Sequence, residues 1–68
     1  MPPKIRKLKA VLSKAGFISR SAKGSHTYWE HIQYSDLYIT LSGHDGDDAE
    51  KYQERDVNKI IKEAERRK

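Results

Sequence analysis

Apolar residues near the start of the chain recur at the spacing of one helical face. Between residues 5 and 15, neighbouring apolar residues on this face are three or four positions apart: Ile5, Leu8, Val11, Leu12 and Ala15. Lysine and arginine side chains fill the opposite face of this segment, as expected for a helix with one buried side. Gly16 follows, and glycine often closes a helix because it accepts a left-handed backbone. The pattern predicts a helix over residues 4–15, with Phe17 folded back against Leu12.

The middle of the chain has the pattern of an antiparallel sheet. Its apolar and β-branched residues fall into three short runs, which predict strands over residues 17–21, 25–32 and 37–41. Residues 22–24 and 33–36 read as the connecting turns. In the third run Leu37, Ile39 and Leu41 alternate with polar neighbours, so one face of the sheet is covered.

A polar loop over residues 42–48 leads to a second helix. Asp47 and Glu50 have the spacing of a capping box at its start. The helix body carries an apolar stripe, made of Val57, Ile60, Ile61 and Ala64. The order helix, three strands, helix predicts an α+β sandwich, with both helices on one face of a three-stranded antiparallel sheet. The other face of the sheet is expected to be free.

Length and composition narrow the classes of protein further. A chain of 68 residues makes one domain, residues 1–68, and its thin core leaves an exposed face as the place for a site. With no cysteine there is no disulfide, thiol chemistry or cysteine-based zinc site. Neither a signal peptide nor a membrane span is recognisable. We therefore expect a cytoplasmic, soluble protein without a membrane partner.

Charge is distributed unevenly along the chain. Residues 1–29 carry seven basic and no acidic side chains, whereas residues 30–68 carry seven basic and ten acidic ones. Such asymmetry points to a polyanion, with nucleic acid as the first candidate. A merely solvated charged helix is the plainer explanation. Charge alone does not choose among RNA, DNA and anionic lipid.

The predicted turn Lys23-Gly24-Ser25-His26 is the strongest candidate for chemistry. In the plain interpretation Gly24 supplies a positive φ and His26 starts a strand. In the functional one, Gly24 lets backbone N–H groups approach a phosphate, Lys23 and Arg20 neutralise its charge, and His26 exchanges a proton. That combination is what RNA cleavage without a metal needs.

Other residues are weaker candidates. His31 has the opposite parity to His26, so a metal site shared by the two is not expected. His44, in the loop after the third strand, is a candidate second proton carrier if that loop folds toward the hairpin. Tyr38 is the aromatic residue best placed to be exposed and to stack on an unpaired base, whereas Trp29 is expected to be packed. The acidic loop lacks the glycine and glutamate positions of a calcium site.

Taken together, these segments resemble the HicA toxins, also known as YcfA-like mRNA interferases. The similarity rests on Lys14-Ala15-Gly16-Phe17 at the end of the first helix, on Lys23-Gly24-Ser25-His26, and on Thr40-Leu41-Ser42-Gly43-His44. The resemblance implies a double-stranded-RNA-binding-like fold and cleavage of mRNA by a single histidine, which maps onto His26. It also implies a cognate HicB-type antitoxin that covers the site. The acidic stretch 45–50 and the charged last helix depart from the family pattern.

The sequence thus predicts a toxin that is a metal-independent mRNA endoribonuclease and needs no cofactor. Its expected RNA-binding residues are Arg20, Lys23, Gly24, Ser25 and Tyr38, with Lys7 on the basic first helix. A non-catalytic RNA-binding module with the same basic segments is the alternative. A subunit that works only through a protein partner is a third possibility, and it would not bind RNA.

Overall fold

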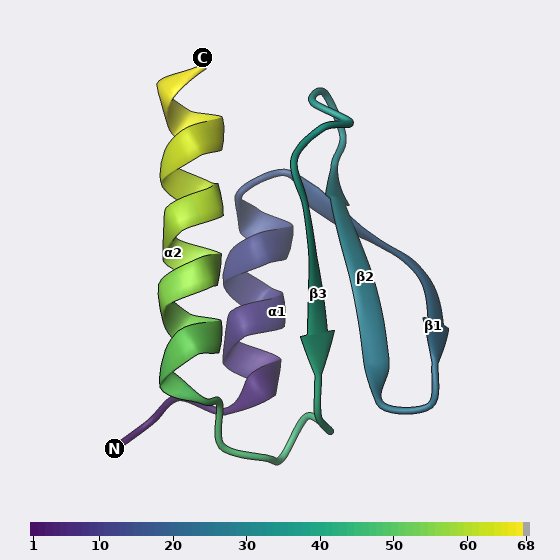
Figure 1. Cartoon of the computed structure of the whole chain (residues 1–68), viewed down its shortest axis with the longest axis vertical. Helices are drawn as coiled ribbons and strands as arrows, with labels where there is room; N and C mark the ends of the chain where they lie inside the picture. Colours follow the sequence, from purple (N-terminus) through teal and green to yellow (C-terminus); the bar gives the residue numbers. More distant parts are fainter. Residues whose placement is uncertain (68) are drawn as a thin grey trace.

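The computed structural model describes residues 1–67, with every side chain among them except those of Ser21 and Ala22. Five elements follow one another in the predicted order: α1 (Ile5–Lys14), β1 (Phe17–Lys23), β2 (His26–His31), β3 (Tyr38–Ser42) and α2 (Lys51–Arg66). Figure 1 shows the two helices side by side, next to the strands. Neither described helix is both long and apolar enough to cross a membrane.

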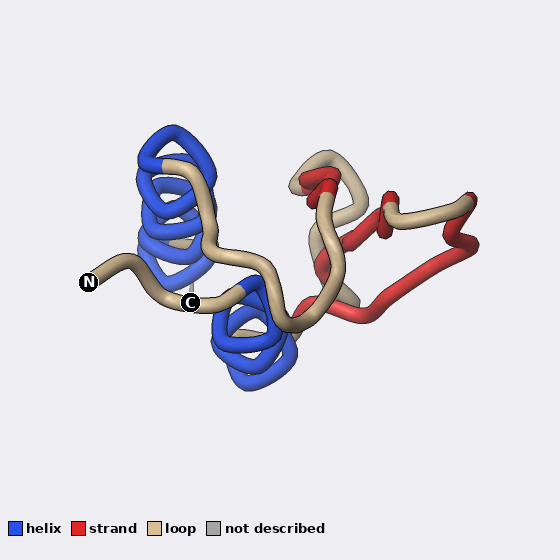
Figure 2. Tube along the Cα trace, turned by 90° about the horizontal axis from the view of Figure 1, so that it is seen from below, coloured by secondary structure: helices blue, strands red, loops and turns tan. Residues whose placement is uncertain are grey.

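The strands form one antiparallel sheet in the order β1-β2-β3. Both helices lie on the same side of it, as the view along the elements shows (Figure 2). α1 contacts β1, and α2 contacts β3 and α1. The predicted α+β architecture, with two helices on one face of a three-stranded sheet, is therefore confirmed.

The core fills the space between the helices and the sheet. Its fully buried side chains come from both layers and include Ile5, Leu12, Phe17, Leu41 and Val57. Trp29, in the middle of the central strand, is also buried, as predicted. Gly16 has a φ of +98°, so it closes α1 in the expected left-handed conformation and lets Phe17 return to the core.

The acidic loop supplies the groups that close the start of α1. Helix α1 has neither a side-chain cap nor an acidic residue in its first turn. Instead, the backbone N–H groups of Ile5 and Arg6 donate to the carbonyl oxygens of Asp47 and Asp45, at 2.9 and 3.2 Å. The carboxylate of Asp45 also accepts a hydrogen bond from Lys9 Nζ at 2.6 Å. A carboxylate near the start of a helix is stabilising, because it interacts with the positive end of the helix dipole.

The predicted capping box at the start of α2 is wrong in its residues. The N-cap is Glu50, whose N–H donates to Gln53 Oε1 at 2.8 Å. The carboxylate of Asp47 is used in the preceding loop instead, where its Oδ2 accepts a hydrogen bond from the N–H of His44 at 2.9 Å. A carboxylate that already closes the preceding turn is not available to cap the helix, so the helix begins three residues later than the Asp47 box implied.

The far end of the sheet is tied to the end of α2. Arg67 forms a bidentate salt bridge with Asp36 of the β2–β3 loop, and both N···O distances are 2.9 Å. Its carbonyl oxygen accepts from the hydroxyl of Tyr34 at 3.1 Å, and its guanidinium lies 5.3 Å from the centre of the Tyr34 ring. These contacts fix the loop between β2 and β3 against the second helix.

Candidate active site on the open sheet face

The alternation of side chains along β2 decides which histidine can reach a substrate. Trp29 and His31 point toward the helices and are buried, whereas His26 is exposed. His26, Tyr28 and Glu30 share the face that no helix covers. The expected opposite placement of His26 and His31 is confirmed. We call this uncovered surface the open face, and its side chains are Ile18, Arg20, Lys23, His26, Tyr28, Glu30, Tyr38, Thr40 and Ser42.

Strand register places Lys23 and Ser42 on either side of His26. Lys23 on β1 and Ser42 on β3 are its direct partners across the sheet. The turn between β1 and β2 consists of Gly24 and Ser25, so it starts two residues later and ends one residue later than the predicted 22–24, because β1 continues through Lys23. The N–H of Gly43 donates to the carbonyl oxygen of Ser25 at 3.1 Å, which holds this turn against the end of β3.

Gly24 leaves the backbone beside His26 accessible. Its φ is +62°, and a Cβ atom added there would meet nothing within 4 Å. The glycine is therefore required by the turn rather than by crowding. Open space at this point lets an anionic group approach the backbone of the turn, with the exposed Lys23 next to it.

Arg20 reaches the open face from an irregular part of β1. The register between β1 and β2 shifts between Ser19 and Ala22, which marks a β-bulge. The guanidinium Nε of Arg20 lies 3.9 Å from Oε1 of Glu30, and both residues project from the open face. Glu30 is the acidic residue of this face, and Arg20 offsets its charge.

Two tyrosines lie farther along the same face. The rings of Tyr28 and Tyr38 are stacked, with centroids 5.8 Å apart and planes inclined by 25°. Tyr38 is 56% exposed, as the sequence predicted. Tyr28 was not among the predicted site residues, although its parity with His26 is the signal that places it there.

Two of the predicted site residues lie outside the strands that carry the others: Lys7 on α1, and His44 in the loop after β3. Lys7 lies on α1, in the layer behind the sheet. His44 is exposed in a loop that turns toward the start of α1, and its backbone is engaged by Asp47. Among the described residues, the imidazoles of His26 and His44 have no hydrogen-bond partner in common.

His31 has a structural environment. Its Nδ1 accepts a hydrogen bond from the N–H of Gln33 at 3.0 Å, and its ring packs edge-on against Phe17 and stacks on Tyr34. Its Nε2 is buried and has no partner within residues 1–67. The ring is enclosed, so it serves the core rather than the open face.

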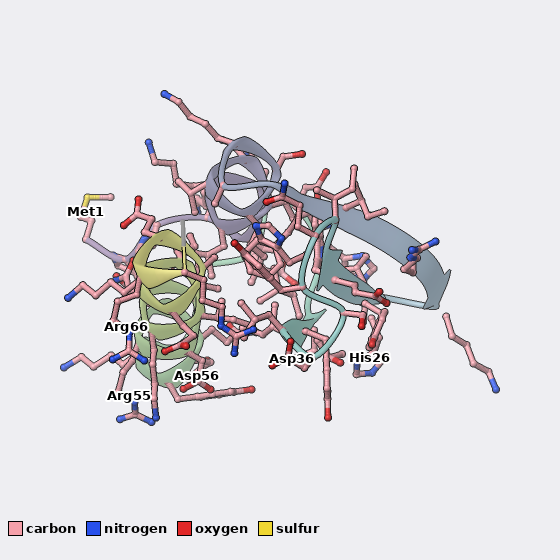
Figure 3. The ribbon with its side chains drawn as sticks, turned by 90° about the horizontal axis from the view of Figure 1, so that it is seen from above. Met1, His26, Asp36, Arg55, Asp56 and Arg66 are labelled. Carbon is pink, nitrogen blue, oxygen red and sulfur yellow. The ribbon has the colours of Figure 1, made fainter. Side chains whose placement is uncertain are left out.

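The open face therefore joins an exposed imidazole to a basic turn and an aromatic pair. Figure 3 shows His26 projecting on the side of the molecule away from α1. Among the described residues, histidine and acidic side chains form no cluster of three or more that could hold a metal ion. Proton transfer and contact with an anion are the chemistry that these side chains offer.

Comparison with known families gives the class of protein. A family model described as the HicA toxin of bacterial toxin-antitoxin systems matches residues 5–65. Neither the curated proteins nor the solved structures gave a significant match.

Because the match spans nearly the whole chain, the chain belongs to the HicA toxin family. It is thus the toxin of a toxin-antitoxin pair, and an antitoxin is its counterpart.

Proposed function

We propose that this toxin is an mRNA endoribonuclease that works without a metal ion and uses His26 as its catalytic residue. The observation that carries the proposal is the row Lys23, His26 and Ser42 on the open face, beside the accessible turn at Gly24. Membership in the HicA family supports it. An exposed site also suits a long polymer, which a deep pocket would exclude.

The reaction needs two proton transfers and one anion site. The ribose 2′-oxygen forms a bond to the adjacent phosphorus while the bond from phosphorus to the 5′-oxygen breaks, which leaves a 2′,3′-cyclic phosphate and a 5′-hydroxyl. A histidine can take the proton from the 2′-hydroxyl or give one to the leaving oxygen. His26 performs one of these transfers, and His44 or a water molecule performs the other.

The remaining residues hold the phosphate. Lys23 and Arg20 supply positive charge where negative charge builds up in the transition state, and the backbone of Gly24 and Ser25 offers N–H groups. The cognate partner is a HicB-type antitoxin that covers the open face and so blocks access to His26. The protein acts in the cytoplasm, where its mRNA substrate is.

The test compares the wild type with His26→Ala on a long RNA in excess EDTA, after circular dichroism has shown that both are folded. We expect the wild type to cut and the variant to be slower by about a hundredfold or more, the usual loss for a proton-transferring group. His44→Ala tests the second transfer and is expected to lose less, because water can replace the imidazole. Arg66→Ala, exposed on α2, is the control and should cut like the wild type.

Equal cleavage by wild type and His26→Ala would contradict the proposal. If both proteins bind RNA equally and neither cuts it, the chain is a binding module and the catalytic role is wrong. Cleavage products ending in a cyclic phosphate would support attack by the 2′-hydroxyl.

A further inference from the structure

Tyr38 lies on the edge strand β3, between the open face and a groove that separates β3 from α2. One side of its ring faces Tyr28, since the two rings are stacked 5.8 Å apart. Tyr38 also lines a groove of about 380 Å³ between β3 and α2. The rest of the groove is lined by Leu37, Ile39 and Ile60 and by the charged Asp56, Lys59 and Glu63. A flat ring with an apolar groove beside it is suited to receive another flat ring.

The open face is basic along one edge and aromatic toward the other. The basic side chains Arg20 and Lys23 both come from β1, and the stacked tyrosines come from β2 and β3. Glu30, the acidic residue between these regions, has Arg20 3.9 Å away. A nucleotide strand with its phosphates over β1 and its bases over β3 would match this arrangement of charge and aromatic rings.

We propose that Tyr38, braced by Tyr28, stacks on an unpaired base of the RNA at the groove between β3 and α2, and that this contact makes the toxin select single-stranded RNA. The inference rests on the proposed function, because it names the form of RNA that the same site accepts. Figure 3 shows that Asp56 of α2 and His26 project on the same side of the molecule, away from α1. One strand can therefore reach both regions.

A base in a duplex cannot make this contact, because its two faces are already stacked on neighbouring bases. Tyr38 is four residues along β3 from Ser42, the partner of His26, which is about 13 Å at the usual strand rise. The stacked base therefore belongs to a nucleotide that flanks the cut, and not to the nucleotide whose 2′-hydroxyl reacts. Tyr28 touches the ring of Tyr38 and acts as a positioning residue.

The experiment measures binding separately from cleavage. His26→Ala protein is titrated with a short unstructured RNA that carries 2-aminopurine, whose fluorescence falls when the base stacks on an aromatic ring. Anisotropy of the same RNA with an end label gives the affinity. A blocked hairpin of equal length is the duplex competitor. Tyr38→Ala and Tyr38→Phe are made in the same background, with Tyr52→Ala as the control, because Tyr52 is similarly exposed, at 51%, but lies on α2 and outside the groove.

We expect Tyr38→Ala to weaken binding about tenfold, which is the usual effect of losing one stacked base, and to abolish the quenching. Tyr38→Phe should retain both signals, because the aromatic ring is kept, and Tyr52→Ala should behave like its parent. Equal affinity for the hairpin and the single strand would overturn the inference. So would unchanged quenching in Tyr38→Ala, which would leave the aromatic pair as a contact for a protein partner.

The inference and the proposed function can fail separately. If the wild type cuts RNA but Tyr38→Ala and Tyr52→Ala bind alike, only the stacking contact is wrong. If Tyr38→Ala loses binding and quenching while the wild type cuts nothing, the stacking contact holds and the catalytic proposal fails.

Discussion

The contact between Gly16 and His31 shows how one residue sets the geometry of both layers. Gly16 ends α1 with a φ of +98°, and a Cβ atom added to it would lie 3.0 Å from Nε2 of His31. The buried ring of His31 fills the space that a side chain would occupy. A turn conformation and a close approach therefore demand glycine at the same position.

Gly16→Ala is expected to lower the free energy of unfolding by about 1–2 kcal/mol from the backbone conformation alone, with the contact on His31 adding to the loss. Urea denaturation of the purified variant measures this. Gly46→Ala is the control, since nothing lies within 4 Å of an added Cβ atom and its φ is not positive. A loss of stability equal to that of Gly46→Ala would contradict the argument.

The sequence predicted the residues that follow a simple periodicity. Parity along β2 separated His26 from His31, and alternation along β3 predicted an exposed Tyr38. Asp47 was misassigned because its carboxylate accepts the N–H of His44, a local contact that competes with helix capping and leaves no trace in the spacing of residues. Tyr28 was missed because aromatic residues on a strand are more often buried than free.

At the scale of elements, both helix positions depend on segments that are distant in sequence. The register of β1 past its bulge, and the loop that closes α1, are set by tertiary contacts, so helix and strand patterns alone could not predict them. The tie between Arg67 and the β2–β3 loop is of the same kind. Its hydrogen bond to Asp36 lowers the pKa of that carboxyl below its ordinary value of 3.8.

The lowered pKa of Asp36 determines how the salt bridge between Asp36 and Arg67 depends on pH. Because the pKa of Asp36 is lowered in the folded protein, the pair stabilises the fold fully above pH 3.8, and the contribution is lost as pH falls through and below that value. Arg67→Ala should therefore be less stable than the wild type near pH 7, and the difference should shrink toward pH 3. Added salt should shrink it as well, since both groups are exposed.

Urea denaturation at several pH values measures this difference. Arg66→Ala is the matched control, because Arg66 pairs with Glu63 on its own helix and does not reach the loop. If the two arginine variants lose the same stability at every pH, the tie between loop and helix contributes nothing.

At the scale of the whole molecule, the positive charge of residues 1–29 is divided between two surfaces. Arg20 and Lys23 lie on the open face, whereas Lys7 lies in the helix layer. Lys9 is paired with Asp45, and Lys4 with Asp48. Part of the basic first helix is thus neutralised by the acidic loop, so the charge asymmetry of the sequence overstates the positive charge that the surface presents to a polyanion.

The salt dependence of RNA binding should separate these two surfaces. A contact between one lysine and one phosphate contributes a slope of about −0.7 to log K against log salt on a single strand. Lys23→Ala is expected to flatten the slope by about that amount, whereas Lys7→Ala should leave it unchanged. Binding in the His26→Ala background, measured between low and moderate salt, gives both slopes. An equal change in the two variants would mean that RNA also contacts α1.

The closure of α1 by residues 45–48 also has a consequence for synthesis. The ribosome delivers α1 first, yet the carbonyl groups that accept its leading N–H groups come from Asp45 and Asp47. A nascent chain that has released only α1 and the first hairpin holds His26 without a finished helix layer behind the sheet. Folding of this toxin on the ribosome is therefore expected to wait until the acidic loop has emerged, so that a chain interrupted before Asp45 leaves the start of α1 without its hydrogen-bond acceptors.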